Sequence, residues 1–285
     1  MKFKRYNDLH EFVKENDKLI NEKEWLNNLM IGNINYGLKN GTDEGWLMAK
    51  VEDNGNTELI MLLRRPWKLL LYSPTNNSSD ELYKFTSEAV YEVDKDIPGV
   101  NAEKVIANKF AKYYCEKTQK DFKLHTPMRI LVIKEMIPFD LKEDVVFRSA
   151  KQSDKDVLTK FIQDFHVEAL HDEWPYEKAE EYFYNHLDGG YYVLEHNGKI
   201  VSQVVAARRM PKGIGIGGVY TPKEERGKGY AFNVVYRATK LQFDNGSEYC
   251  VLYTDDKNPI SNHVYEKMGY KRMVDVEDLD FVDEK

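Results

Sequence analysis

Two glycines and two cations stand together in residues 226–231, which read RGKGYA. They follow the apolar run GIGIGGVY (213–220), which is typical of a strand, and they open a run with the periodicity of a helix. A helix N-terminus leaves several backbone N–H groups without partners and carries a partial positive charge, so it suits a phosphate group. Glycines let the backbone approach such an anion closely, and the arginine and lysine add countercharge. The pattern therefore predicts a turn that holds a pyrophosphate. The alternative is a turn in which glycine serves geometry alone.

The sequence around this turn resembles two motifs of the GNAT superfamily of N-acyltransferases. The stretch VYTPKEERGKGYA (219–231) is similar to motif A, R/Q-x-x-G-x-G/A, which is met by Arg226, Gly229 and Ala231. The stretch NPISNHVYEKMGY (258–270) is similar to motif B. The residues that match motif B are Asn258, Ser261, Tyr265, Lys267, Gly269 and Tyr270. The two stretches together imply that the chain binds acyl-CoA.

The resemblance covers about residues 145–285 and implies a reaction. In this family the loop of motif A holds the pyrophosphate of the CoA through backbone N–H groups, and the preceding strand binds the pantetheine arm. The implied reaction is the direct transfer of an acetyl group from acetyl-CoA to a primary amine of a small molecule or a peptide. The cofactor-binding residues that the resemblance implies are Val219, Tyr220, Thr221, Arg226, Gly227, Lys228, Gly229, Tyr230, Ala231, Asn258 and Ser261.

Two catalytic roles follow from the same resemblance. Tyr265 matches the family tyrosine that often protonates the departing CoA thiolate, and an unperturbed tyrosine pKa of about 10 suits that role. The alternative for Tyr265 is a core aromatic on its helix. The general base stays open, because the strand 213–220 carries no carboxylate and no histidine. Glu168 is the preferred base. The alternatives are His166, His171, Asp255, Asp256 and deprotonation through water.

The composition argues against several other classes of function. The chain has 285 residues and a formal net charge of -7, so it lacks the basic surplus typical of nucleic-acid binding. No apolar run approaches the roughly 20 residues of a membrane span. The cysteines, Cys115 and Cys250, and the seven histidines show no metal-binding spacing, so no metal is expected. We expect a cytoplasmic protein whose partner is a small-molecule or peptide amine, with no nucleic acid and no membrane. The sequence also permits a homodimer.

The second half of the chain predicts a defined order of elements. A short strand is followed by two helices, three strands, a helix, a strand, a helix and a final strand within 270–281. Asn197-Gly198 marks a hairpin between the first two of the three consecutive strands. Ser153 and Asn258 are the expected N-caps of the first and last helices of this half.

The first half shows a looser version of the same order: a helix, three strands, two helices and a strand at 128–136. Asn54-Gly55 marks a hairpin there. We therefore expect an α/β (α+β) fold with a mixed, mostly antiparallel sheet flanked by helices. Its domains are residues 1–140, an N-terminal domain that resembles a degenerate GNAT domain, and residues 145–285, the acyl-CoA-binding catalytic domain.

Two other functions compete with acetyl transfer. The chain could bind acyl-CoA without turning it over, as a sensor or interaction module, because the strand before the loop lacks a carboxylate. It could also transfer acyl groups in a reaction that involves tRNA, but its acidic balance disfavours that function.

Overall fold

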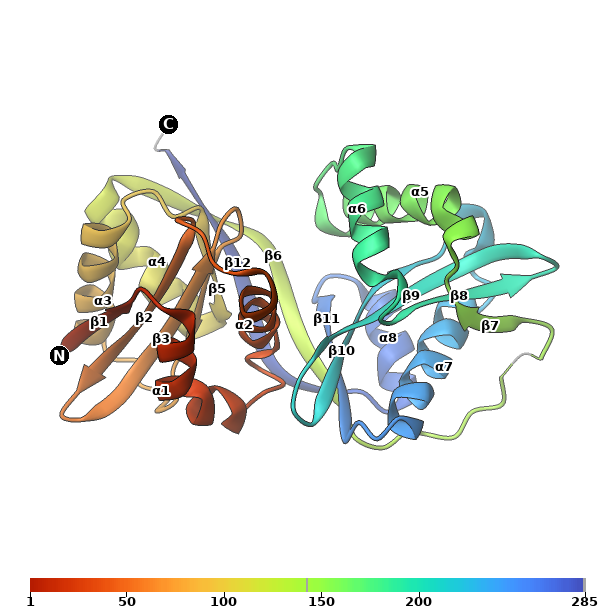
Figure 1. Ribbon diagram of the computed structural model, residues 1–285, viewed down its shortest axis with the longest axis horizontal. Coiled ribbons are helices and arrows are strands. Elements are labelled where there is room, and N and C mark those ends of the chain that lie inside the picture. The colour runs from red at the N-terminus through yellow and green to blue at the C-terminus, as the bar shows by residue number, and fades with distance from the viewer. Residues whose placement is uncertain (142, 284–285) are drawn as a thin grey trace. The chain divides into compact units, whose positions relative to one another are not determined.

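The computed structural model describes residues 1–141 and 143–283, and contacts divide the chain into two units (Figure 1). Unit 1 contains Met1–Ile130, Asp255–Lys257 and Met273–Lys285, and unit 2 contains Leu131–Thr254 and Asn258–Arg272. The end of the chain thus belongs to unit 1, although the sequence placed all of residues 145–285 in the C-terminal domain.

The elements of the second half follow the predicted order. They are β7 (Val146–Ser149), α5 (Lys155–Phe165), α6 (Tyr176–Leu187), β8 (Tyr191–His196), β9 (Lys199–Arg209), β10 (Gly213–Tyr220), α7 (Tyr230–Asp244), β11 (Tyr249–Asp255), α8 (Pro259–Met268) and β12 (Lys271–Asp283). Three short turns of helix, η1 (Gln152–Asp154), η2 (His166–Leu170) and η3 (Lys223–Glu225), lie between them.

The first half has the same order of elements as the second. It consists of β1 (Lys2–Tyr6), α1 (Leu9–Glu22), α2 (Asn28–Asn40), β2 (Trp46–Asp53), β3 (Asn56–Arg64), β4 (Leu69–Tyr72), α3 (Asp80–Val93), β5 (Gly99–Glu103), α4 (Lys104–Thr118) and β6 (Lys120–Ile133). The order β-α-α-β-β-β-α-β-α-β therefore occurs twice along the chain. Sequence analysis missed β1, β5 and the separation of α1 from α2, and so made the first half look less regular than it is.

The strands pair in two similar series. Neighbours run in the order β1-β2-β3-β4-β5-β12 in unit 1, and in the order β6-β11-β10-β9-β8-β7 for unit 2, which β6 enters at Leu131. β4 is parallel to β5, as β10 is to β11, whereas β1–β2, β2–β3, β3–β4, β5–β12, β7–β8, β8–β9 and β9–β10 are antiparallel. The predicted fold class, a mixed and mostly antiparallel arrangement flanked by helices, is confirmed.

Both predicted hairpins form at their Asn-Gly pairs. Asn54 and Gly55 have φ values of 48° and 83°, and Asn197 and Gly198 have values of 51° and 74°. Two consecutive left-handed residues are what a two-residue turn of type I′ needs, and asparagine and glycine adopt that conformation most readily. These short sequence signals therefore fixed the registers of β2 with β3 and of β8 with β9.

Hydrophobic residues pack on both faces of the unit 2 strands. Val204 and Val205 are neighbours in β9 but belong to different clusters, as the alternation of side chains along a strand requires. One cluster contains Ile214 and Ile216 with residues of α7, and the other contains residues of α5 and α6 with Tyr220. Figure 1 shows α5 and α6 on one side of β8 and β9 and α7 on the other.

The prediction of Ser153 as an N-cap was wrong. Ser153 lies inside the 3-10 turn η1, and α5 begins at Lys155. The neighbouring Asp154 takes the capping role for η1, because its Oδ2 accepts a hydrogen bond from the backbone N–H of Lys151 at 2.7 Å. The same carboxylate forms an ion pair with Arg148 at 2.7 Å, which anchors the turn to β7.

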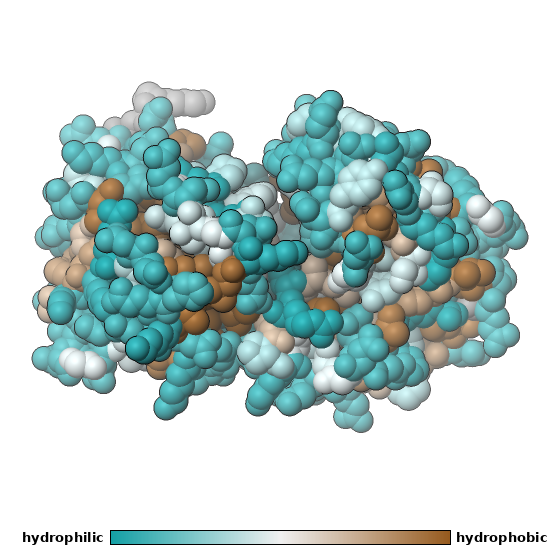
Figure 2. Space-filling model, viewed as in Figure 1, coloured by the Kyte–Doolittle hydropathy of each residue, from teal (hydrophilic) through white to brown (hydrophobic). Residues whose placement is uncertain are grey.

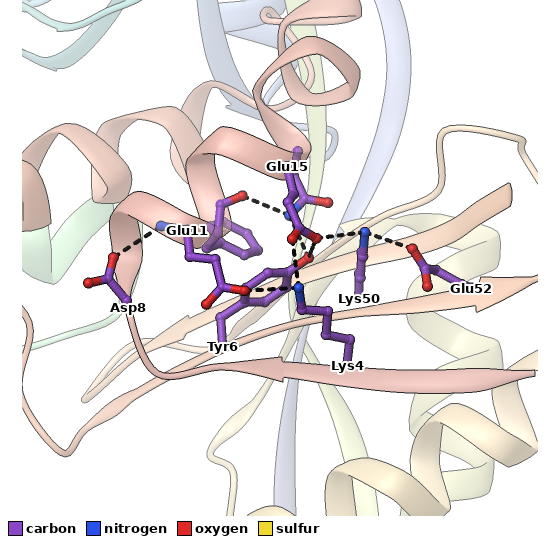
Figure 3. A network of polar contacts seen from close by, with 9 residues as sticks. Lys4, Tyr6, Asp8, Glu11, Glu15, Lys50 and Glu52 are labelled. Carbon is purple, nitrogen blue, oxygen red and sulfur yellow. Dashed lines mark hydrogen bonds and ion pairs between the residues drawn. The ribbon is translucent and has the colours of Figure 1, made fainter. Parts of the chain in front are cut away.

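A polar network holds α1 against β1 and β2 in unit 1 (Figure 3). Its centre is Glu15, whose carboxylate lies 2.6 Å from Lys4 Nζ and 3.1 Å from Lys50 Nζ. Lys50 is buried and also pairs with Glu52 at 2.7 Å. The Tyr6 hydroxyl donates a hydrogen bond to Glu15 at 2.7 Å. Lys50 is the buried charge of this network, and its pairing with Glu15 and Glu52 compensates for its removal from water.

Hydrophilic residues cover most of the face shown in Figure 2, with hydrophobic patches between them. The longest described helices, α4 and α7, have 15 residues each. Within residues 1–141 and 143–283, none of the helices combines the length and the apolar character that crossing a membrane requires.

Candidate active site

The parallel strands β10 and β11 separate part of the way along β10. Their register pairs Gly213, Ile214 and Gly215 with residues of β11, and the last pair is Gly215 with Val251. β10 continues to Tyr220, so in the described sheet its last five residues have no partner in β11. Two parallel strands that diverge leave backbone donors and acceptors on facing edges, where an extended, amide-containing chain can bind.

A bulge lies in the diverging part of β10. On the β9 side, Gly217 pairs with Val205 and Tyr220 pairs with Gln203, so β10 has one residue more than β9 between these pairs. Gly218, in the bulge, has a φ of 59°, and a Cβ placed there would lie 3.3 Å from Val205 Cγ2. Glycine is therefore required both by the backbone conformation and by the close packing.

Two buried side chains of β9 hold this bulge in place. Ser202 Oγ donates a hydrogen bond to the carbonyl of Tyr220 at 3.1 Å, and Gln203 Nε2 donates one to the carbonyl of Gly218 at 3.1 Å. Gln203 Oε1 in turn accepts a hydrogen bond from the Tyr191 hydroxyl at 2.7 Å. Sequence analysis gave Ser202 and Gln203 no role, because a lone serine or glutamine in a strand carries no signal of its partner.

The predicted pyrophosphate loop connects η3 to α7. Gly227 and Gly229 have φ values of 76° and 84°, and a Cβ placed on either would meet no atom within 4 Å. The two glycines are thus required by left-handed backbone conformation, while the space beside them is open.

The N-terminus of α7 differs from that of α3, its counterpart in unit 1. In the described structure no side chain caps α7, and its first turn holds no acidic residue. At α3, Ser79 accepts a hydrogen bond from the N–H of Leu82, and Asp80 and Glu81 occupy the first turn. An anion is favoured at the positive end of α7 but not at α3, where two carboxylates and a side-chain cap already stand.

Both cations of the loop are paired with carboxylates. Arg226 Nη2 lies 2.7 Å from Glu168 Oε2, and Arg226 Nε donates a hydrogen bond to the carbonyl of Thr221 at 2.9 Å. Lys228 Nζ lies 2.7 Å from Glu225 Oε2. Arg226 and Lys228 therefore flank the loop, as the motif suggests, but much of their charge is already balanced.

Glu168 connects η2 to the segment from Tyr220 to Arg226, which lies 52 to 58 positions further along the chain. It lies in η2, a single π-turn, and it accepts a hydrogen bond from the Tyr220 hydroxyl at 3.3 Å in addition to its pair with Arg226. Burial acts to raise the pKa of Glu168, but the hydrogen bond and charge of Arg226 outweigh it and hold that pKa below its usual range. The carboxylate is therefore ionised at neutral pH and is a weak base.

The motif B residues Asn258 and Ser261 form the start of α8. Asn258 Oδ1 accepts a hydrogen bond from the backbone N–H of Ser261 at 3.1 Å, which confirms the predicted N-cap. Ser261 Oγ lies 3.1 Å from Thr254 Oγ1. These side chains fix the helix to the end of β11, so they shape the site through the backbone.

Tyr265 is buried on the inner face of α8. Its ring packs edge-on against Tyr270, with centroids 5.9 Å apart. Burial raises the pKa of Tyr265 to about 12. The hydroxyl is therefore protonated at neutral pH but is a weaker acid than that of free tyrosine.

The other four candidate bases differ in burial and in the residues that they contact. His166 is buried and stacks on Trp174, with ring centroids 3.4 Å apart, and burial lowers the pKa of His166 to about 4. His171 ends η2 in a left-handed conformation and is exposed. Asp255 and Asp256 belong to unit 1, where Asp256 forms an ion pair with Arg129. Glu168, in contrast, contacts the predicted loop through its ion pair with Arg226.

Among the residues that the structure describes, no three histidine, cysteine, aspartate or glutamate side chains are grouped so that they could hold a metal ion. The two cysteines, Cys115 and Cys250, are both buried, and burial raises the pKa of each thiol to about 12. Neither is an activated nucleophile, because the thiolate form is the reactive one.

Residues 156–270 match the model of the Acetyltransferase (GNAT) family. The structure is similar to an acetyltransferase from the GNAT family of Colwellia psychrerythraea, with 15% identity, full coverage of both chains and a TM-score of 0.61. It is also similar to a GCN5-related N-acetyltransferase from Sphaerobacter thermophilus, with 14% identity, 98% of this chain and 95% of that chain covered, and a TM-score of 0.64. No curated protein matches the sequence.

A third similar structure bears on the repeated order of elements. It is a tandem GNAT protein from the clavulanic acid biosynthesis pathway, with 10% identity, 99% of this chain and 98% of that chain covered, and a TM-score of 0.57. Identities at this level show a shared fold alone, and the fold is shared over both halves. The chain therefore carries a domain of the GNAT acetyltransferase family at residues 156–270, preceded by an N-terminal part with a GNAT-like order of elements.

Proposed function

We propose that this chain transfers an acetyl group from acetyl-CoA to a primary amine of a small molecule or a peptide by direct attack. The observation that carries the proposal is the divergence of β10 from β11 after Gly215, followed further along the chain by the N-terminus of α7, which no side chain caps in the described structure. The extended pantetheine arm and the diphosphate of CoA fit those two features in that order along the chain.

The CoA would be held mainly by backbone groups. The N–H groups from Gly227 to Ala231 face the pyrophosphate, with Arg226 and Lys228 beside it. The pantetheine arm lies along Val219–Thr221, where β10 has left β11. Asn258 and Ser261 keep the start of α8 beside this edge. This binding mode depends on backbone conformation, which explains why left-handed glycines occur in the loop.

Acyl transfer needs a neutral amine and a proton for the departing thiolate. Glu168 is ionised but has a lowered pKa, so we propose that it positions the loop and the acceptor while the amine loses its proton through water. Tyr265 stays the proposed proton donor. Its raised pKa makes that donation depend on contact with the developing thiolate.

One acetyl-CoA per chain is expected, and it should bind to unit 2. The counterpart of the loop in unit 1 leads to α3, whose N-terminus is capped by Ser79 and followed by two acidic residues. Calorimetric titration of the purified chain with CoA should therefore give a stoichiometry of one. A stoichiometry of two would contradict the distinction between α7 and α3.

The activity can be tested by thiol release. Purified protein is mixed with acetyl-CoA and a panel of polyamines, amino acids, aminoglycosides and N-terminal peptides, and free CoA thiol is measured. We expect release that depends on one class of acceptor. If no acceptor increases the release above the rate with acetyl-CoA alone, the proposed transfer fails.

A second candidate function is favoured by one observation. β10 carries no carboxylate, and the two carboxylates that contact the loop, Glu168 and Glu225, are paired with Arg226 and Lys228. A protein that binds acyl-CoA as a sensor would need no base. Calorimetric CoA binding with a stoichiometry of one, combined with no acceptor-dependent thiol release, would favour the sensor over the transferase. A cytoplasmic location and a homodimer stay predictions.

A further inference from the structure

The strand β10 has glycine at every second position in its first five residues. Gly213, Gly215 and Gly217 alternate with Ile214 and Ile216, whose side chains belong to the cluster that contains residues of α7. Because neighbouring side chains of a strand point to opposite faces, the three glycines put no side chain of β10 on its other face. That face lies on the side of α5 and α6. The ring of Tyr249 fills the space beside Gly213, where a Cβ would lie 2.3 Å from Tyr249 Cζ, and Gly215 and Gly217 remain.

An arginine from β9 covers the rest of this face. Ala207 pairs with Gly215 and Arg209 pairs with Ile214, so Arg208 is an extra residue at a second bulge. Its φ of 54° is left-handed, a conformation that is strained for an arginine. Bulges redirect a side chain, and here the redirected side chain is that of Arg208.

The guanidinium of Arg208 lies over Gly215 and Gly217. A Cβ placed on Gly215 would come within 2.9 Å of Arg208 Nε and 3.0 Å of Nη2, and one on Gly217 would lie 3.8 Å from Nη2. The glycines therefore make room for the guanidinium. Gly215 is also the last β10 residue that pairs with β11, so the cation lies where the two strands begin to separate.

Two polar groups of α6 lie near this cation. The Tyr182 hydroxyl would be 3.9 Å from a Cβ on Gly218. His186 packs against Tyr182 with ring centroids 4.1 Å apart, and its Nδ1–H donates a hydrogen bond to the Tyr182 carbonyl at 2.8 Å. Burial lowers the pKa of His186, and the charge of Arg208 lowers it further. The imidazole therefore adds no second positive charge beside Arg208 at neutral pH.

We infer that Arg208 binds a carboxylate of the acyl acceptor, so that the acceptor is a small amine that also carries a carboxylate. A planar guanidinium forms two parallel hydrogen bonds with a carboxylate, which fixes orientation as well as charge. An amino acid held in this way would present its amine to a thioester bound along the diverging part of β10. This inference names the substrate class and rests on the proposed acetyl transfer.

The test measures acceptor binding rather than turnover, so that it is independent of catalysis. Protein saturated with CoA is titrated calorimetrically with a panel of amino acids, with their methyl esters, and with O-phosphoethanolamine. We expect at least one amino acid to bind roughly tenfold or more tightly than its ester, as the loss of a charge-assisted hydrogen-bonded pair implies.

Two variants separate a binding role from a structural one. Arg208→Gln should abolish the preference for the acid over the ester while CoA affinity stays as in the unchanged protein. Arg209→Gln, an exposed neighbour in the same strand, should retain the preference. If Arg208→Gln unfolds the protein, Arg208→Lys serves instead, because it keeps the charge but loses the paired hydrogen bonds and should weaken the preference.

Three results would overturn the inference. They are equal binding of every acid and its ester, tighter binding of O-phosphoethanolamine than of all the carboxylates, and a preference that survives substitution of Arg208. Absence of thiol release with carboxylate binding intact would instead contradict the transferase proposal. It would leave Arg208 as the group that binds a carboxylate, but the bound molecule would then not be an acyl acceptor.

Discussion

At the scale of single residues, the candidate site depends on backbone conformation more than on side-chain charge. The two cations of the loop are already paired with Glu168 and Glu225, whereas Gly227 and Gly229 are left-handed and open to solvent. Sequence analysis placed these cations and glycines together in one turn before a helix, and the structure has this turn between η3 and α7. It could not show that Arg226 was paired, because Glu168 lies 58 positions away in the sequence.

The left-handed glycine of the loop gives a direct test of phosphate binding. Gly229→Glu should raise the dissociation constant for CoA roughly 100-fold or more, because a carboxylate beside the phosphates costs several kcal/mol. The matched control is Gly246→Glu, since Gly246 has a φ of 91°, follows the same helix and also has open space beside it. Both variants should lose about 1–2 kcal/mol of stability. Equal CoA affinity in the two would place the phosphates elsewhere.

His166 should make the protein less stable in mild acid. Its pKa is lowered from 6.5 to about 4 by burial, so between these values the unfolded chain binds a proton that the folded protein does not. Stability therefore falls as pH decreases from about 6.5 to about 4, by about 3 kcal/mol in total. Urea unfolding across this range should show the slope.

The decrease in stability between pH 6.5 and pH 4 should be smaller in His166→Phe, which retains an aromatic ring against Trp174. His10→Phe, at an exposed position, is the control and should keep it. An unchanged slope in His166→Phe would assign the acid sensitivity to other groups.

At the scale of elements, local signals predicted some features and missed others for identifiable reasons. The Asn-Gly turns fixed two hairpins, and Asn258 with Pro259 fixed the start of α8. β1 (KFKRY) was missed because three of its five residues are cations, and β5 (GVNAE) because it is short and begins with glycine. The bulge in β10 could not be predicted, since it depends on the register with β9.

The bulge should depend on the buried amide of Gln203. Gln203→Met removes partners from the Gly218 carbonyl and the Tyr191 hydroxyl, and leaving two buried groups unsatisfied should cost about 2–5 kcal/mol. Gln242→Met is the comparison, because Gln242 is also buried but has a single, longer hydrogen bond of 3.4 Å to Tyr192. Urea unfolding should show the larger loss for Gln203→Met. A smaller loss would mean that packing alone holds the bulge.

At the scale of the whole chain, the most distant pairing is that of the last strand. Val276 to Asp280 of β12 pair with β5 in unit 1, and Phe281 stacks on Tyr114 with ring centroids 5.0 Å apart. Nothing in the local sequence of β12 indicates which half it completes, because its alternating apolar and acidic residues predict a strand but not the partner of that strand. The sequence therefore led us to expect two domains that are each continuous in the chain. In the structure, unit 1 combines Met1–Ile130 with a segment from the end of the sequence.

A substitution near the C-terminus should consequently weaken unit 1. Leu279 is buried in the unit 1 core, so Leu279→Ala should cost about 2–5 kcal/mol. Hydrogen exchange should show faster exchange at the amides of β5. Met273→Ala, at an exposed position of the same strand, is the control. Slow exchange in β5 of the Leu279 variant would show that unit 1 is stable without this contact.

The pairing of the last strand, β12, with β5 also determines when the N-terminal half can finish folding during translation. Asn101 and Asp278 are hydrogen bonded at 3.3 Å although they are 177 positions apart. A ribosome that adds 5–20 residues per second needs roughly 9–35 s to cover that interval. During this time the outer edge of β5 has no β12 to pair with, and an unpaired edge strand is a template for aggregation. The half of the protein that is made first must therefore wait for residues 276–280 before β5 is paired on both sides.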